Sequence, residues 1–176
     1  MNLYREISCN NYSKVNKEIL DYINNIGLID SSKVFWNPID IVEFLKSVPL
    51  FQQWTVKNKI MIKSVAVTIG RNIQCCGPHI DTPPARYKLS WPVLNAEQSF
   101  NRWFREKTSG AKTVVNLYNG LTYLDLDDLV EIGRRATNGP AIIDAGIPHD
   151  VQFLVDKPVW PRIVLQCQLF KEPDLL

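Results

Sequence analysis

Histidine is scarce in this sequence, and its scarcity narrows the search for a metal site. Of 176 residues only two are histidines, His79 and His149. Imidazole is the commonest protein ligand for transition metals. A metal site with two imidazole ligands therefore has to bring these two residues together.

Extremes of charge and hydrophobicity are also missing. The formal net charge is +2, which is too small to indicate a general binder of nucleic acid or of membrane surfaces. No apolar run approaches the roughly 20 residues of a membrane-spanning helix, and residues 1–6 lack the apolar core of a signal peptide. We therefore expect a cytoplasmic protein with no membrane partner.

The four cysteines form no metal-binding or redox motif. Cys9, Cys75, Cys76 and Cys167 contain no Cys-x-x-Cys spacing, and adjacent cysteines cannot readily serve as a zinc-knuckle pair. We expect reduced thiols packed as small apolar side chains. An oxidation-sensitive site at Cys75 and Cys76, close to His79, stays open. The sequence also lacks a Gly-rich phosphate loop and a nucleophile elbow.

Length and composition predict one domain with a sizeable core. The 176 residues match the length of one domain, and 45% apolar with 10% aromatic residues can supply its interior. We expect a single domain over residues 1–176. Within it we expect a helical buttress at 1–58, a jelly-roll core at 59–170 and a C-terminal tail at 171–176.

The first third of the chain has the spacing of amphipathic helices. One apolar stripe ends near Gly27 and consists of Val15, Ile19, Tyr22, Ile23 and Ile26. A second predicted helix has Asn37 as its cap and Pro38 at its first position, and it ends before Pro49. The apolar side of each predicted helix needs a surface to pack on. A sheet would provide that surface, so residues 1–58 are interpreted as a helical buttress that packs against the sheet.

From residue 59 onward, β-branched and aromatic runs recur between Gly, Pro and Asn residues. The predicted strands are residues 59–70, 87–94, 99–105, 113–118, 140–144, 151–155 and 162–170, and 126–132 is expected to form a short helical insertion. Short strands with long connections favour a jelly roll, a pair of sheets that can hold a small ligand between them. The expected fold class is mainly β with N-terminal helices (α+β).

Three polar residues in this pattern could share one ion. His79 opens the triplet His79-Ile80-Asp81, and His149 follows the predicted strand at 140–144. Because side chains two residues apart on a strand share a face, His79 and Asp81 can approach one point. With His149 they form the facial triad of two imidazoles and one carboxylate that leaves open positions on Fe(II). The alternative is that all three are polar residues at strand ends.

The order of these residues resembles that of the Fe(II)/2-oxoglutarate-dependent oxygenase family, which has His-x-Asp, a distant His and a downstream Arg. The segments that carry the resemblance are Pro78-His79-Ile80-Asp81, Arg86-Tyr87-Lys88-Leu89-Ser90-Trp91-Pro92-Val93, Ile147-Pro148-His149-Asp150-Val151 and Arg162-Ile163-Val164-Leu165. The short frame is similar to compact members from bacteria and their viruses. The resemblance implies a double-stranded β-helix, the cupin-like jelly roll, and for a phage-encoded member the cytoplasm of the host.

The resemblance also implies the chemistry. His79, Asp81 and His149 would be the catalytic metal ligands for Fe(II), with 2-oxoglutarate and O2 as co-substrates. The expected reaction hydroxylates a substrate C–H bond and releases succinate and CO2. Because Asp81 is present, hydroxylation is favoured over halogenation, for which relatives have a small residue at this position.

Arg162 is the residue that the resemblance assigns to the co-substrate. Its planar guanidinium suits a two-pronged pair with the distal carboxylate of 2-oxoglutarate. Many relatives have Ser or Thr two residues later, where this chain has Val164. Ser90, Tyr87 or Lys88 could supply the missing hydrogen bond. Strand alternation puts Lys88 and Ser90 on one face of the strand and Tyr87 on the other.

The sequence leaves the primary substrate open. Basic and aromatic residues are interleaved between residues 84 and 113: Arg86, Lys88, Arg102, Arg105, Lys107 and Lys112 with Trp91, Phe100, Trp103 and Phe104. Such a rim suits an acidic metabolite, a peptide or nucleic acid, and the alternative is ordinary outer-strand surface. Gln168 stands where nucleic-acid demethylases of the family have a second arginine. A peptide or prolyl side chain, or a free metabolite, is therefore favoured over nucleic acid.

Two other classes remain compatible with the pattern. A non-catalytic jelly-roll binding or structural module would have the same strands without the metal. A metal-dependent cupin enzyme would bind iron without using 2-oxoglutarate. Arg162 would then be an ordinary strand arginine, paired for example with Asp156 or Glu172.

Overall fold

The computed structural model of the chain describes residues 3–30, 36–71, 77–81, 86–108, 113–115 and 122–170. The helices in these residues are α1 (Tyr12–Asn25), α2 (Ile41–Ser47), α3 (Pro49–Lys57) and the short 3-10 helix η1 (Leu126–Asp128). The strands are β1 (Tyr4–Glu6), β2 (Trp36–Ile39), β3 (Ile62–Gly70), β4 (His79–Ile80), β5 (Tyr87–Leu94), β6 (Ser99–Glu106), β7 (Thr113–Val115), β8 (Thr122–Leu124), β9 (Leu129–Ala136), β10 (Ala141–Asp144), β11 (His149–Phe153) and β12 (Arg162–Leu169).

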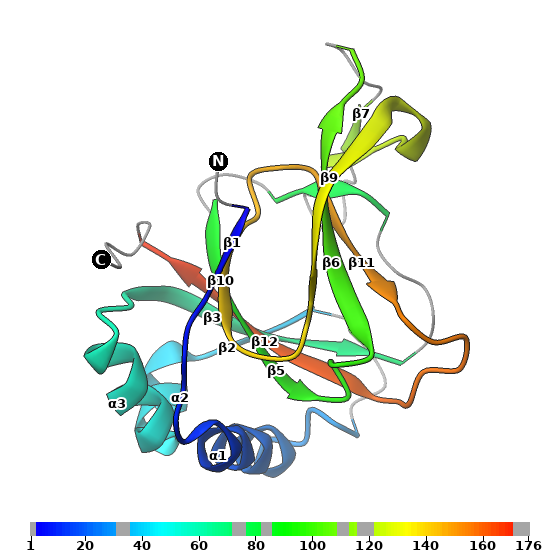
Figure 1. The fold of residues 1–176 in the computed structure, drawn as a ribbon. Coiled ribbons are helices and arrows are strands. Elements are labelled where there is room, and N and C mark those ends of the chain that lie inside the picture. Colours follow the sequence, from blue (N-terminus) through cyan, green and yellow to red (C-terminus); the bar gives the residue numbers. More distant parts are fainter. Residues whose placement is uncertain are drawn as a thin grey trace.

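The strands form two antiparallel sheets (Figure 1). Sheet A has the order β1-β10-β5-β12-β3-β2, and sheet B has the order β7-β8-β4-β11-β6-β9. The fold is therefore mainly β with three α-helices in the described residues, as in a jelly-roll-like β-sandwich. This confirms the expected fold class at the level of secondary structure and layers.

The three helices cover one face of sheet A, and sheet B lies on the opposite side of that sheet (Figure 1). Side chains of β12 alternate between the two faces of sheet A. Those of Ile163, Leu165 and Cys167 belong to the hydrophobic core under the helices. Val15, Ile19, Tyr22 and Ile23 of the predicted stripe are buried in the same core. Since an amphipathic helix is stabilised mainly by packing, the sheet supplies the surface that these helices need.

Trp91 of β5 is the centre of the contact between helices and sheet. It is fully buried, and its indole nitrogen donates to Asn16 Oδ1 of α1 at 3.1 Å. Its ring centroid lies 5.3 Å from Tyr12, 5.3 Å from Phe51 and 4.9 Å from Trp54. The contacts with Phe51 and Trp54 are edge-to-face, an arrangement that adds to the free energy of apolar burial.

The space between the sheets is lined by polar side chains. On sheet A, the residues that alternate with the helix-side core face this space, and the buried ones include Thr68, Lys88, Ser90 and Arg162; Asn101 is a buried polar residue of sheet B. A small apolar cluster closes one part of this interior, where Trp103 of sheet B packs on Ala141 and Ile143 of sheet A. Buried polar groups need hydrogen-bond partners, and in this interior Thr68 donates to the carbonyl oxygen of Val164 at 3.0 Å.

The predicted start of the second helix is wrong. Trp36–Ile39, which includes Asn37 and Pro38, is the edge strand β2 paired with β3. The helix begins at Ile41 instead, where the Asp40 side chain accepts from the backbone N–H of Glu43 at 2.8 Å. Proline is tolerated at a sheet edge because it has no N–H to leave unpaired. Residues 1–58 thus contribute β1, β2 and the unpredicted helix α3 in addition to the two predicted helices.

Two other boundaries also differ from the prediction. The helical insertion expected at 126–132 is limited to η1, and Leu129–Ala136 is a full strand paired with β6. The strand expected at 151–155 is His149–Phe153, so His149 lies within it. Pairing with distant strands decides both segments, and local propensity is a weak guide there. Of the strand expected at 113–118, residues 116–118 lie outside the described residues, as do Cys75 and Cys76.

Cys167 is packed as an apolar residue, as predicted. It is fully buried in the helix-side core, and burial raises the pKa of its thiol. Cys9 is partly buried against the same core. In the described part of the chain, no helix has the length and hydrophobicity to cross a bilayer.

Candidate metal centre

His79 and His149 are brought together by strand pairing. β4 and β11 run antiparallel in sheet B, and the Cα atoms of the two histidines are direct register partners. Their ring centroids lie 4.5 Å apart, and both side chains belong to the same face of the sheet. Trp103 of β6 pairs with His149 on its other side.

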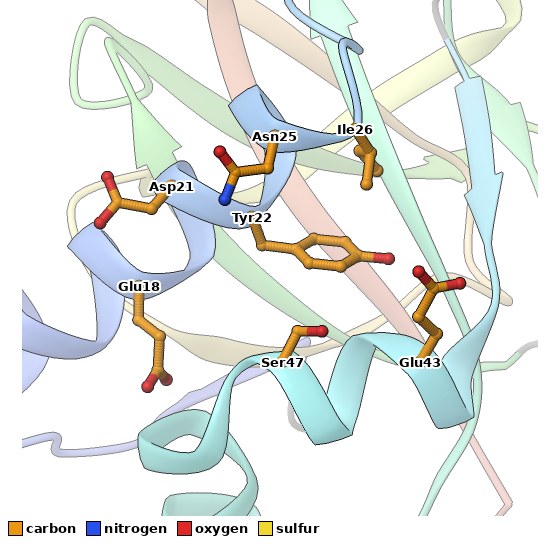
Figure 2. A pocket seen from close by; sticks show the side chains of 7 residues that line it. All are labelled: Glu18, Asp21, Tyr22, Asn25, Ile26, Glu43 and Ser47. Atoms are coloured by element: carbon orange, nitrogen blue, oxygen red, sulfur yellow. The ribbon is translucent and has the colours of Figure 1, made fainter.

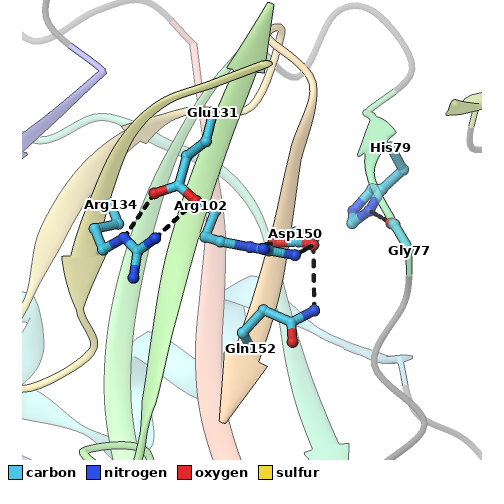
Figure 3. A network of polar contacts seen from close by, with 7 residues as sticks. All are labelled: Gly77, His79, Arg102, Glu131, Arg134, Asp150 and Gln152. Carbon is cyan, nitrogen blue, oxygen red and sulfur yellow. Dashed lines mark hydrogen bonds and ion pairs between the residues drawn. The ribbon is translucent and has the colours of Figure 1, made fainter. Parts of the chain in front are cut away.

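The hydrogen bonds of both histidines select one tautomer. Nδ1 of His79 lies 2.9 Å from the carbonyl oxygen of Gly77 (Figure 3), and Nδ1 of His149 lies 2.9 Å from that of Ile147. A carbonyl oxygen only accepts, so Nδ1 carries the proton in each ring. Nε2 is then the nitrogen with a lone pair, which is the arrangement that orients a metal-binding imidazole.

Asp81 joins the histidines from the end of β4. Its backbone N–H donates to the carbonyl oxygen of Ala145 at 3.1 Å, which fixes the chain just after the strand. Its Oδ2 atom lies 3.8 Å from Nε2 of His149. Ligand atoms of His79, Asp81 and His149 all lie within 4.8 Å of one another. The predicted triad is therefore assembled.

One buried oxygen of this cluster lacks a hydrogen bond. Oδ2 of Asp81 is shielded from solvent and has no hydrogen-bond partner. Nζ of Lys88 lies 2.5 Å from it and forms an ion pair, but without the angles of a hydrogen bond. The same ammonium lies 5.0 Å from the ring centroid of Trp36. A buried anionic oxygen with unused lone pairs suits a cation ligand.

Burial keeps His149 neutral. Its pKa is lowered to about 4, first by burial and then by the charge of His79, while the carboxylate of Asp81 acts in the opposite direction. A neutral imidazole is the form that binds metals. Two imidazole nitrogens and one carboxylate oxygen match the donor set of a facial triad, and the three side chains could bind a metal ion.

The structure separates the residues predicted to bind the co-substrate. Lys88 lies at the metal cluster, and Ser90 accepts from Nε2 of Gln166 at 3.4 Å on the same face of sheet A. Tyr87 lies on the other face of β5, packed against the helix-side core. The structure therefore does not bring Tyr87 to the cluster.

Arg162 lies further along the interior. It is buried, and its Nε donates to Oγ of Ser99 on the opposite sheet at 2.8 Å. Ser99 and Trp103, the partner of His149, are separated along β6 by roughly 13 Å of extended backbone. Asn101 lies between them on the same face and is buried. Arg162 and the metal cluster therefore contact different positions along β6.

Sequence reasoning missed three residues of this interior. Ser99 positions Arg162, Trp36 faces the Lys88 ammonium, and Gln166 has a buried Oε1 atom with no hydrogen-bond partner. Gln166 could have been found, because a residue four positions after Arg162 on one strand shares its face. Ser99 and Trp36 could not, since only the packing of the two sheets places them.

The outer face of sheet B carries a polar network that fixes β11 (Figure 3). Asp150, which follows His149 and points to the opposite face, is fully buried and accepts from Nε and Nη2 of Arg102 at 3.0 and 2.6 Å. Gln152 adds a third bond to this carboxylate at 3.3 Å. Bidentate pairs of this type are the stronger class of ion pair. The network therefore supports the pairing of β6 with β11 that presents His149.

A separate pocket of about 380 Å³ lies between α1 and α2 (Figure 2). It is lined by Glu18, Asp21, Tyr22, Asn25, Ile26, Glu43 and Ser47. Glu18 accepts from the backbone N–H groups of Leu50 at 3.0 Å and Phe51 at 3.3 Å, so it caps the start of α3. Asp21 pairs with Lys17 at 2.6 Å. These carboxylates serve the helical layer and lie on the side of sheet A that faces away from the metal cluster.

Comparison with known proteins gives distant structural likenesses. No protein-family model matches the chain, and no curated protein matches it either. The ligand-free L-ribose isomerase of Cellulomonas parahominis matches over 97% of this chain and 88% of its own, with 14% identity and a TM-score of 0.36. The L-ribose isomerase of Acinetobacter sp. DL28 matches over 59% of this chain, with 17% identity and a TM-score of 0.34. The chain covers 46% of that second isomerase, less than half its length. At such TM-scores these likenesses establish neither fold nor activity.

Proposed function

We propose that the chain is a non-haem Fe(II) and 2-oxoglutarate-dependent oxygenase that hydroxylates a substrate C–H bond and releases succinate and CO2. The observation that carries the proposal is the assembled set of His79, Asp81 and His149. Their ligand atoms lie within 4.8 Å of one another, and Oδ2 of Asp81 is buried without a hydrogen bond. This is the donor set that leaves positions open for a chelating co-substrate and oxygen.

Strand order supports a double-stranded β-helix. Along the chain β3, β4, β5 and β6 alternate between sheets A and B, and β9, β10, β11 and β12 alternate in the same way. The central orders are then β10-β5-β12-β3 and β4-β11-β6-β9. Two interleaved hairpin series of this kind characterise the jelly roll of cupin-like proteins, and we include this fold in the proposal.

The residues around the cluster have distinct roles in this proposal. A bound Fe(II) ion would supply the redox chemistry with oxygen and the oxo acid. His79 and His149 would each bind it through neutral Nε2, and Asp81 would reduce the net charge of the site. The Arg162 guanidinium, whose Nε donates to Ser99, would donate hydrogen bonds to the distal carboxylate of 2-oxoglutarate.

Ser90 and Lys88 are the other residues proposed to contact 2-oxoglutarate. Both are buried on the face of β5 that points between the sheets. Val164, two residues after Arg162, has no hydroxyl, whereas Ser90 offers one from β5, where it is paired with Gln166 of β12. We propose Ser90 as the hydrogen-bond donor that replaces it.

We propose a cytoplasmic protein whose primary substrate is a peptide side chain, with prolyl peptides as the first class to screen and free metabolites as the second. This choice rests on the resemblance to compact members of the family and on Gln168, which replaces the second arginine of nucleic-acid demethylases. Gln168 is occupied by a hydrogen bond from Ser64 Oγ at 3.0 Å, which supports a structural use of this position.

Anaerobic titration with Fe(II) and then 2-oxoglutarate tests the function. The expected result is one bound Fe(II), followed by the weak visible charge-transfer band of an oxo acid chelated to iron, and succinate formation after oxygen is admitted. Iron binding without any effect of 2-oxoglutarate would identify a metal-dependent cupin enzyme instead. Absence of stoichiometric iron would identify a binding or structural module.

A further inference from the structure

We infer that Lys88 is the resident counter-cation of the metal site: in the metal-free protein its ammonium neutralises Asp81, and an incoming divalent ion has to displace it. This inference rests on the proposed function, because it assumes that the cluster binds a metal. It adds a control of metal affinity by a residue that is not itself a ligand.

The first support is that the Lys88 ammonium already lies at the carboxylate oxygen that a metal ion would need. Oδ2 of Asp81 lies 2.5 Å from Nζ of Lys88 and 3.8 Å from Nε2 of His149. Oδ2 is therefore the carboxylate oxygen that faces the imidazole. A metal ion bound to His149 and to this oxygen would lie within a few ångströms of the ammonium. Two positive charges at that separation repel strongly where water is excluded.

The second support is burial. Both side chains of the ion pair are only 8% exposed, and a buried carboxylate without a compensating charge is strongly unfavourable. The compensating charge in the metal-free protein comes from Lys88, which reaches the site from sheet A while the ligands belong to sheet B and its adjoining segment.

The third support is that a second favourable contact for the Lys88 ammonium lies close by. The ion pair lacks hydrogen-bond geometry at Oδ2, so the attraction between Lys88 and Asp81 is mainly Coulombic and does not fix the orientation of the ammonium. The Trp36 ring centroid lies 5.0 Å from Nζ, and an aromatic face attracts a cation. Lys88 can therefore leave Asp81 for the Trp36 face through a change of side-chain torsions, without any rearrangement of β5.

The test compares wild type, Lys88→Met and the control Lys63→Met, which changes an exposed lysine on strand β3 of the same sheet. Each protein is titrated with Mn(II) alone by calorimetry, and its thermal unfolding is followed with and without Mn(II). We expect Lys88→Met to bind Mn(II) roughly tenfold or more tightly than wild type, because a competing charge is gone. We also expect it to melt roughly 5 °C or more below wild type without metal, and level with it at saturating Mn(II). Lys63→Met should match wild type in both measurements.

The outcomes separate this inference from the proposed function. If wild type binds Mn(II) and 2-oxoglutarate but Lys88→Met gains no affinity, Lys88 is not a counter-cation and the oxygenase proposal stands. If Lys88→Met gains affinity but 2-oxoglutarate has no effect on either protein, the oxygenase proposal fails and the role of Lys88 stands. Failure of wild type to bind Mn(II) overturns both. Should metal-free Lys88→Met not fold, Lys88→Gln replaces it, because its amide can donate to Asp81 without a charge.

Discussion

His79 and His149 face each other across β4 and β11, as direct register partners whose ring centroids lie 4.5 Å apart. The metal cluster is therefore a property of sheet register. A shift of one residue between these strands would turn one imidazole to the outer face of sheet B. The Arg102–Asp150 pair on that outer face supports the register of β11 against β6, which presents His149.

Replacing His149 with Gln should remove metal binding while the fold persists. Glutamine can keep a polar group near Ile147, but its amide is a much poorer metal ligand than a neutral imidazole. We expect Fe(II) affinity to fall by roughly 100-fold or more and succinate formation to disappear. Anaerobic calorimetry and succinate quantification are the measurements. Lys63→Met, at an exposed position of β3, is the control, and wild-type turnover in His149→Gln would remove His149 from the metal shell.

Stability of the metal-free protein should fall on acidification because of His149. Its pKa is near 6.5 in the unfolded chain and about 4 in the folded one, chiefly through burial. Between these values the unfolded state binds the extra proton, so the free energy of unfolding decreases as pH falls, by about 3 kcal/mol across the window. Urea unfolding across that range measures the slope. His149→Gln should give a shallower slope, and equal slopes for both proteins would contradict the assignment.

The same lowered pKa bears on metal binding. The His149 ring is already neutral above about pH 4, so its protonation does not limit metal affinity in mildly acidic solution.

Replacing Arg162 with Ala should weaken 2-oxoglutarate binding and leave iron binding nearly intact. The guanidinium is buried and would pair with the distal carboxylate, so its removal leaves that charge without a partner. We expect roughly 100-fold weaker 2-oxoglutarate binding, measured from the visible charge-transfer band under argon. Arg134→Ala, on the exposed outer face of β9, is the matched control. Unchanged 2-oxoglutarate affinity in Arg162→Ala would favour a cupin enzyme that uses no oxo acid.

Replacing Trp91 with Ala should destabilise the attachment of the helical layer. The side chain is fully buried among Tyr12, Phe51 and Trp54, and its loss leaves a large cavity. We expect the free energy of unfolding to fall by about 3–5 kcal/mol, measured by urea denaturation. Trp91→Phe should cost less, because it keeps most of the ring area and loses the bond to Asn16. Met61→Ala, at a position 56% exposed, should change little, and a similar loss there would point to a non-specific effect.

Local pattern was sufficient for much of the fold. The strand predicted at 87–94 has the observed bounds of β5. The stripe predicted for the first helix supplies the buried side of α1, except for Ile26, which follows the helix and is exposed. The predicted division of Lys88 and Ser90 from Tyr87 on opposite faces of β5 is confirmed. These features depend on residues close in sequence, whose spacing relative to a helix or strand period decides which side is buried.

The segments that were predicted wrongly are those whose structure depends on distant partners. Residues 36–39 have a helix-start pattern but pair with β3, and residues 129–132 have a helical pattern but pair with β6. Backbone hydrogen bonds to another strand outweigh such weak local preferences.

The amino-acid sequence by itself determined which residues could form a site: two histidines, an aspartate two positions from the first, and an arginine downstream. Tertiary structure alone decided that β4 and β11 pair His79 with His149, that Lys88 reaches Asp81 from the other sheet, and that Ser99 holds Arg162. The physical reason is the difference in the sequence separation over which the two kinds of interaction act. Residue type and strand periodicity act over a few positions, whereas register, burial and the resulting pKa of His149 arise only when segments far apart in the chain exclude water together.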